Sequence, residues 1–396
     1  MAQQSKGTKQ NEMAQLAFRF VLIIGVVNFF ADFTYEGARS IMGPFLGSLG
    51  ASATVVGFVA GFGEMLGYVL RVLSGFLAQK THRYWTFAFI GYFVNMLAVP
   101  LLALTGNWPL AAALMIAERT GRAIRKPAVE TMLSYATKEM GRGWVFGFNE
   151  ALDQTGATIG PLLVAVVLYL KGGYRNCFAA LLIPALLCLA TVIAAWILYP
   201  RPHELELGEI ELDKSKAFTK SYWLYVLASA LVAAGFADFS LIAFHFQNAT
   251  VVSSELVPVF YAVAMATGAI AGLVFGRLLD KFGFIVLITA FLFASFAAPF
   301  AFSENAVLAS IGMVLWGIGL GAQDSLLKAE LTAVVPKTQR SSAFGLFDGG
   351  FGVAWFLGSA AMGLLYEKSI LALVILSVVL QLTALPVFLL AKRYAQ

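Results

Sequence analysis

Charged side chains are scarce in this chain of 396 residues. Aspartate, glutamate, lysine and arginine make up 12% of it, against about 25% in ordinary soluble domains. Cysteine occurs only twice and histidine three times. Cys177 and Cys188 lie eleven residues apart in one apolar segment, which is roughly 16 Å along a helix and too far for a disulfide. The scattered histidines form no metal-binding pattern, and we expect neither a metal nor a cofactor.

The sequence also lacks a phosphate-binding Walker motif and any grouping of a nucleophile with a general base. ATP-driven pumping and enzymatic catalysis are therefore not expected. The net charge of +5 comes from basic residues at the ends of apolar segments and in one polar stripe. We therefore expect no nucleic-acid partner.

Apolar residues dominate instead. They make up 60% of the chain, and the mean hydropathy is +0.80. Many occur in runs long enough to cross a hydrocarbon core, which takes about 20 residues per helix. Twelve such runs predict an all-α membrane protein with twelve transmembrane helices. The predicted spans are 17–46, 54–79, 84–105, 108–136, 142–170, 174–199, 221–247, 254–280, 282–302, 305–334, 340–366 and 369–392.

One long polar stretch, 201–220, separates the sixth span from the seventh and is predicted to be a cytoplasmic linker. The segments on its two sides repeat each other. Phe30-Ala31-Asp32-Phe33 in the first span matches Phe236-Ala237-Asp238-Phe239 in the seventh. Further matches occur in the same order, as expected for an internal duplication. We therefore predict two pseudo-symmetric six-helix bundles, 1–200 and 221–396.

Lysine and arginine in the short loops gather on one side of the predicted membrane. By the positive-inside rule, both termini and the linker are expected in the cytoplasm. The first apolar run, which begins near Leu16, is too long for a signal-peptide core and lacks a convincing cleavage site, so we expect it to be retained. Short loops favour a prokaryotic inner membrane. We expect a monomer in the lipid bilayer.

Charge is unevenly distributed among the spans. Spans three, six, nine and twelve carry no ionisable residue in their central portions. The fourth span is the most charged and contains Glu118, Arg119, Arg122, Arg125, Lys126 and Glu130. A charge at the bilayer centre costs about 2.5–3.5 kcal/mol by insertion scales, so these side chains cannot all face lipid. We predict that the four apolar spans face lipid and that the other eight surround a water-filled cavity.

A glycine-containing motif follows the eighth span: Gly276-Arg-Leu-Leu-Asp280-Lys281-Phe-Gly283. It resembles the G-x-x-x-D-[RK]-x-G loop of the major facilitator superfamily, and the twelve spans, the 6+6 split and the linker are also similar to that family. The resemblance covers nearly the whole chain. It implies that spans 1, 4, 7 and 10 line a central cavity. In the first-half copy of the loop, Gln79 and Thr81-His82-Arg83 depart from the pattern, so a weaker gate is expected there.

The loop motif is expected to help gate the transporter by holding one conformation. Two basic residues near the cytoplasmic end of span four are assigned to the same group. The expected gating residues are Gly276, Asp280, Lys281, Gly283, Arg125 and Lys126.

The fifth span contains Gly156-Ala-Thr-Ile-Gly160-Pro161. This segment resembles the G-x-x-x-G-P signature of proton-driven drug antiporters in the superfamily, with Leu162-Leu163 in place of the usual glycine pair. Glycines at this spacing also allow close helix packing, and proline bends a span. Both interpretations stay open.

Four carboxylates are candidates for proton coupling: Asp32 and Glu36 on the first span, and Glu150 and Asp153 on the fifth. Burial favours the neutral acid and a nearby arginine favours the anion, so a carboxylate between these influences can bind and release a proton. The alternative is a set of static ion pairs with span-four arginines that hold the helices together.

Arginines near mid-membrane suit a carboxylate or phosphate on a substrate, because a guanidinium donates two parallel hydrogen bonds. The alternative pairs them internally with acidic residues of spans four and five. Asp324 and Lys328, at i and i+4 on the tenth span, are expected to form a salt bridge on the opposite wall. The predicted substrate and cavity residues are Arg39, Glu118, Arg119, Arg122, Asp324, Lys328, Phe33 and Tyr35.

Together these features predict a proton-coupled secondary transporter that moves a small organic anion or zwitterion by alternating access. The span-five signature favours export. One alternative is proton-driven import of an organic acid or of a metal chelate such as a siderophore. A second is a non-transporting membrane sensor or scaffold, which would show no flux and would usually carry an appended soluble domain.

Overall fold

The computed structural model describes residues 2–135, 142–201, 218–335 and 340–394. Within these ranges, the side chains of 2–14, 142–144, 146–147, 280, 332–334 and 340–342 are outside the description. Every regular element in the described ranges is a helix. The first half contains α1 (Ala2–Ser48), α2 (Ala53–Thr81), α3 (Tyr84–Leu101), η1 (Leu102–Leu104), α4 (Trp108–Tyr135), α6 (Arg142–Tyr169), α7 (Gly173–Ala180) and α8 (Leu182–Leu198).

The second half is more often interrupted than the first. It contains α9 (Lys220–Gly235), α10 (Phe239–Asn248), α11 (Leu256–Phe282), α12 (Ile285–Ala294), α13 (Ala297–Ala301), α14 (Ala306–Ala322), η3 (Gln323–Leu327), α15 (Lys328–Val334), α16 (Arg340–Lys368) and α17 (Ile370–Arg393). The element η3 is a single π-helical turn.

In the described part of the chain, ten helical segments are long and apolar enough to cross a membrane, and a shorter apolar stretch covers Ile285–Ala301. The charged helix α4 has 28 residues, which gives it a length of roughly 42 Å, more than the hydrocarbon core requires. These helices make the chain a multi-pass membrane protein. The predicted linker lies almost wholly outside the described residues.

The predicted span 221–247 is two helices separated by a short extended segment. Phe236 and Asp238 have extended backbone, with ψ of 112° and 140°. The Asp238 carboxylate accepts a hydrogen bond from Ser240 N at 2.8 Å and so caps the start of α10. Aspartate favours this position because its side chain replaces a hydrogen bond that the helix start lacks. The break therefore holds a carboxylate at a fixed place inside the bundle.

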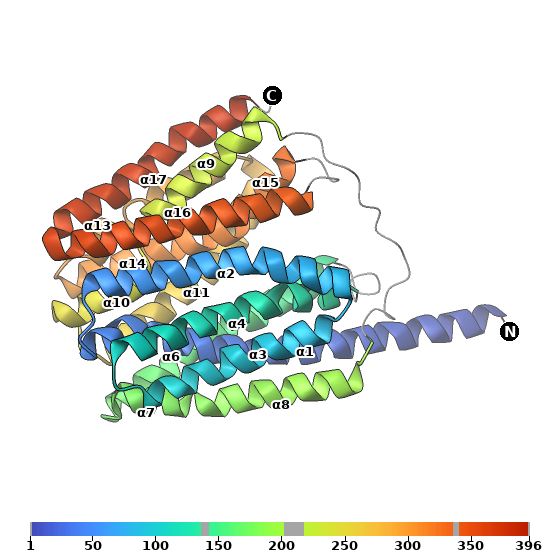
Figure 1. Ribbon diagram of the computed structural model, residues 1–396. Coiled ribbons are helices and arrows are strands. Elements are labelled where there is room, and N and C mark those ends of the chain that lie inside the picture. The colour runs from blue at the N-terminus through green and yellow to red at the C-terminus, as the bar shows by residue number, and fades with distance from the viewer. Residues whose placement is uncertain (1, 136–141, 202–217, 336–339, 395–396) are drawn as a thin grey trace.

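The helices of each half pack mainly with one another (Figure 1). Helices α9 to α17 share one apolar core, with Phe236 and Trp316 among its largest members, while the first half contains two smaller cores. Between the halves, α2 packs along α16, α1 packs against α10, and α6 packs against α11. Large apolar side chains are exposed on α3, α8, α12 and α17, the helices expected to face lipid.

The two halves touch closely where α1 ends, and we call this the closed end. A Cβ on Gly43 would overlap the Ser240 carbonyl group, and a Cβ on Gly57 would lie 2.5 Å from the Ser359 carbonyl oxygen. Gly43 and Gly57 belong to the first half, and both serine residues belong to the second. The marked N-terminus and C-terminus lie at the other end of the bundle (Figure 1). Glycine at these contacts allows the backbones to approach this closely.

Candidate functional site

A buried charge network joins α1, α2 and α4, and the Glu64 carboxylate lies at its centre. One oxygen of Glu64 contacts Arg119 Nη1 at 2.8 Å and Arg39 Nη2 at 3.0 Å. Arg119 Nε also lies 3.4 Å from Glu118. Both arginines were expected to meet substrate. The structure places both in internal ion pairs. For Arg119 the contact with Glu118 is the alternative that the sequence left open, whereas the pairing of either arginine with Glu64 of the second span was not predicted. Their role in substrate binding stays a prediction.

The Glu118 side chain is fully buried between α4 and α3. Asn95 on α3 donates to the Glu118 carboxylate at 2.7 Å and to the Glu118 carbonyl oxygen at 3.1 Å. A buried carboxylate needs such partners, because an unpaired one would carry a large desolvation cost. Asn95 was missed at the sequence level, since it lies in a span expected to be purely structural.

The same network crosses from the first half to the second. Arg39 Nη2 lies 3.5 Å from Asp238 Oδ2 in the break between α9 and α10. The Glu36 carboxylate accepts hydrogen bonds from the hydroxyl groups of Tyr35, its neighbour on α1, and Tyr261 on α11. All five side chains are almost completely buried. Polar groups of both halves are therefore bonded to each other near mid-bundle.

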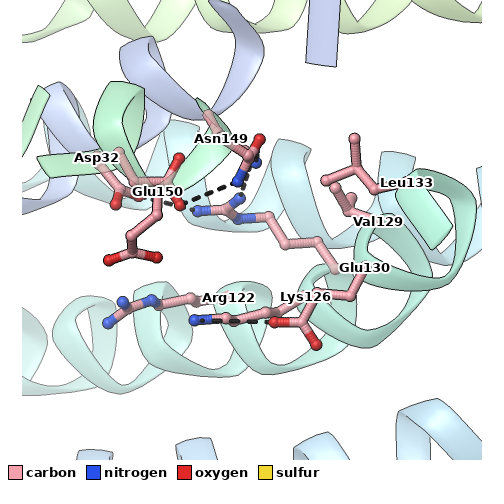
Figure 2. A pocket seen from close by; sticks show the side chains of 11 residues that line it. Asp32, Arg122, Lys126, Val129, Glu130, Leu133, Asn149 and Glu150 are labelled. Atoms are coloured by element: carbon pink, nitrogen blue, oxygen red, sulfur yellow. Dashed lines mark hydrogen bonds and ion pairs between the residues drawn. The ribbon is translucent and has the colours of Figure 1, made fainter. Parts of the chain in front are cut away.

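A polar pocket opens beside this network, between α1, α4 and α6 (Figure 2). It encloses about 110 Å³, room for several water molecules, since one needs about 10–15 Å³. Seven of its eleven lining residues are ionisable. The lining residues are Asn28, Asp32, Arg122, Arg125, Lys126, Val129, Glu130, Leu133, Asn149, Glu150 and Asp153.

Two of the cations in this pocket have acidic partners. Arg125 Nη2 lies 3.7 Å from Asp32, and Lys126 lies 4.0 Å from Glu130 one turn further along α4. The Arg125 guanidinium also stacks on the Tyr92 ring, 4.5 Å from its centroid, where a cation–π contact adds to the ion pair. Arg125 is buried within these contacts.

Arg122 differs from its neighbours on α4. Its guanidinium lies over the Tyr35 ring, 4.1 Å from the centroid. No carboxylate of the described residues lies within 4.0 Å of it. It is only half-buried and borders the pocket. Of the two span-four arginines predicted to meet substrate, Arg122 is therefore the one without an ion pair within 4.0 Å among the described residues.

Two asparagines connect α1 to α6 at the pocket wall. Asn28 donates to Asn149 at 3.0 Å, and Asn149 donates to Asp153 Oδ2 at 3.4 Å. The other oxygen of Asp153 is buried and has no hydrogen-bond partner among the described residues. Glu150 is exposed and, among the described residues, accepts a hydrogen bond from Gln154 alone, at 2.8 Å. The sequence offered one signal for both asparagines, namely their positions next to candidate acids. Asn28 lies one turn before Asp32, and Asn149 directly precedes Glu150.

The second half contributes Asp324 from the π-turn and Lys328 from the start of α15, and both are exposed. The predicted salt bridge between them was wrong: no ion pair within 4.0 Å joins these two described residues. Exposed groups of this kind can each be solvated by water, which removes the gain from pairing.

The loop motif ends α11. Gly283 closes the helix with φ of +65°, a conformation that favours glycine. His82 also has a positive φ, +53°, at the corresponding end of α2, but its ψ is 21° where that of Gly283 is −152°. The two halves therefore end these helices with different turns. Lys281 is exposed over the Phe282 ring, and Gly276 has open space around it. The side chain of Asp280 lies outside the described residues, and the gating roles stay predictions.

Phe33 and Tyr35 lie on different faces of α1. The Phe33 ring packs edge-on to Phe29, 6.0 Å between centroids, and the Phe33 backbone lies against Gly160 of α6. Tyr35 is buried between the Arg122 guanidinium and the Glu36 carboxylate. Tyr35, which was predicted to be a cavity residue, therefore belongs to the polar network.

The sequence matches a family model described as Major Facilitator Superfamily over residues 23–329. The chain belongs to this superfamily. It is 40% identical over 375 residues to an uncharacterized protein of Mycobacterium tuberculosis, covering 93% of this chain and 92% of that one. It is 24% identical over 373 residues to an uncharacterized MFS-type transporter of Methanocaldococcus jannaschii, covering 91% and 92%.

Solved structures of superfamily transporters share the fold. One is a bacterial homologue of the human lysosomal transporter Spinster in an inward-facing, occupied conformation, with TM-score 0.74, 14% identity and coverage of 94% of this chain and 96% of that one. Another is a peptide transporter in complex with alafosfalin, with TM-score 0.75, 14% identity and coverage of 94% and 95%. The predicted superfamily and fold class are confirmed. The chain is a secondary transporter with a small-molecule substrate.

Proposed function

We propose that this superfamily member is a proton-coupled transporter of a small organic anion or zwitterion. It works by alternating access between the two six-helix bundles in the inner membrane, with both termini in the cytoplasm. The observation that carries the proposal is the pocket between α1, α4 and α6, with seven ionisable side chains inside a membrane protein. Such groups in spans mark substrate or proton pathways, because lipid-facing positions do not tolerate them.

Two carboxylates support proton coupling. Asp32 is held by Arg125 at 3.7 Å, a loose ion pair that a proton can replace. Asp153 has one buried oxygen with no partner among the described residues, which a proton would convert into a hydrogen-bond donor. Both residues line the pocket, so protonation and substrate occupancy would influence each other through the same space.

The test is transport by the purified full-length protein in liposomes. A panel of organic acids, zwitterions and amines is offered with and without a pH gradient, and a pH-sensitive dye reports proton movement. We expect substrate flux to rise several-fold with the gradient, and Asp32→Asn to transport without moving protons. Flux that ignores the gradient would contradict proton coupling, and no flux of any compound would favour the sensor or scaffold.

Export is proposed from the span-five signature. Gradients of opposite direction in the same liposomes test it, with orientation assigned by protease access to the linker. Uptake of an organic acid or a metal chelate toward the linker side would replace export by the import alternative.

A further inference from the structure

The charges that line the pocket do not all find partners within the protein. Arg125 pairs with Asp32, and Lys126 pairs with Glu130. After these pairs are removed, one cation, Arg122, and two acids, Glu150 and Asp153, remain. The pocket therefore offers both signs of charge to whatever enters it.

The two remaining acids have different surroundings. Asp153 is held by Asn149 and keeps one oxygen buried, and we have proposed it above as a proton carrier. Glu150 is exposed and extends from α6 toward the α4 side chains (Figure 2). In the part of the chain that the structure describes, its one hydrogen bond comes from the neutral amide of Gln154. Glu150 is therefore the acid best able to meet a cationic group.

Arg122 is the matching site for an anionic group. The Tyr35 ring fixes one face of its guanidinium at 4.1 Å, and no carboxylate of the described residues lies within 4.0 Å of it. Its edge is free to donate two parallel hydrogen bonds to a carboxylate, the arrangement that guanidinium groups favour.

We propose that the substrate is an amino-acid-like zwitterion, with its carboxylate on Arg122 and its ammonium group on Glu150. This inference rests on the proposed function and narrows its substrate class. Val129 and Leu133 give one side of the pocket an apolar surface, which suits a short aliphatic side chain. The enclosed volume of about 110 Å³ suits a small head group, since pockets for drug-sized ligands enclose about 300–1,000 Å³.

The test compares three probes that share one aliphatic chain: leucine, 4-methylpentanoate, which lacks the amino group, and 3-methylbutylamine, which lacks the carboxylate. Binding to the purified full-length protein is measured by calorimetry. We expect leucine to bind about tenfold or more tightly than either analogue, because each analogue loses a charge-assisted hydrogen bond. Equal binding of leucine and 4-methylpentanoate, or no binding of leucine, would overturn the inference.

Two variants test the two charged groups of the ligand one at a time. Glu150→Gln should weaken leucine and 3-methylbutylamine by about tenfold and leave 4-methylpentanoate unchanged. Arg122→Gln should weaken leucine and 4-methylpentanoate and leave the amine unchanged. Glu255→Gln removes the same charge as Glu150→Gln outside the pocket and serves as the control. Glu150→Gln provides the decisive comparison because Glu150 is exposed and makes few contacts that the protein needs for folding. An equal effect of this variant on all three probes would contradict the assignment.

The outcomes also distinguish this inference from the function on which it rests. If a pH gradient drives flux of organic acids while leucine neither binds nor moves, the zwitterion assignment fails and the proposed transporter stands. If no acid, zwitterion or amine moves under any gradient, the proposed function fails as well.

Discussion

Neighbouring arginines on one helix can have opposite roles. Arg125 is buried against Asp32, Asn28 and Tyr92, whereas Arg122 borders the pocket and lies only on the Tyr35 ring. Removing one member of a buried ion pair leaves the other charge unpaired in a low-dielectric interior. This lowers the free energy of unfolding more than removing a cation that has no ion-pair partner. Replacing each arginine in turn should therefore lower the stability of the protein by different amounts.

We expect Arg125→Gln to lower stability by about 3 kcal/mol, because it leaves Asp32 without its cation and removes the contact with Tyr92. Arg122→Gln should cost about 1 kcal/mol, from the cation–π contact alone. Thermal unfolding of both proteins in detergent, followed by tryptophan fluorescence, measures the difference. Equal losses would contradict the assignment of Arg125 to an internal network.

The sequence predicted which helices carry the polar groups but not which groups meet. Local hydropathy and charge are enough to identify the apolar segments and to assign Asp32, Arg122, Glu150 and Asp153 to helices around a polar interior. The partners Asn95 and Tyr261 come from α3 and α11, and their approach depends on helix packing that no local pattern encodes. For the same reason, Arg39 and Arg119 could not be assigned to Glu64 in advance.

At the scale of elements, the fifth-span motif acts through close packing. In α6, Gly156 and Gly160 lie against the backbone of α1, so that a Cβ on Gly160 would overlap the Phe33 carbonyl oxygen. This contact holds the two helices that supply Asp32, Glu150 and Asp153 to the pocket. The packing interpretation of the motif is thus supported by geometry, and the antiporter interpretation stays a prediction.

We expect Gly160→Val to force α6 away from α1, to lower the apparent Tm by several degrees and to reduce substrate flux strongly. Gly67→Ala, at a helical glycine with no neighbour within 4 Å of an added Cβ, is the matched control. It should leave flux unchanged and stability equal or higher by about 0.5–1 kcal/mol, because alanine favours the helix. Full flux in Gly160→Val would show that the contact is dispensable.

At the scale of the whole molecule, a hydrogen bond and an ion pair join the halves near mid-bundle, in addition to the close backbone contacts at the closed end. Glu36 accepts hydrogen bonds from Tyr35 in its own half and from Tyr261 in the other, so the two hydroxyl groups differ only in which half supplies them. Alternating access requires the second bond to break and allows the first to persist. The two tyrosines form a natural pair of test and control.

We expect Tyr261→Phe to shift the population toward conformations with the closed end apart, because it removes a bond made only in the closed arrangement. Tyr35→Phe should leave the population unchanged. Spin labels are attached to cysteines introduced at Ser48 and Asn248, at the ends of α1 and α10. Pulsed electron paramagnetic resonance then measures the distance between these two helix ends. An equal shift in both variants would contradict a role for Tyr261 between the halves.

One oxygen of Glu64 contacts the guanidinium groups of both Arg39 and Arg119. This shared contact affects how much free energy is needed to separate the two halves. When the bundles rock and Asp238 withdraws from Arg39, Arg39 still keeps its contact with Glu64, and Asp238 still caps α10. Each ion therefore keeps one of its two contacts when the other is lost. Parting the halves at this point should cost less than leaving either charge buried with no partner at all.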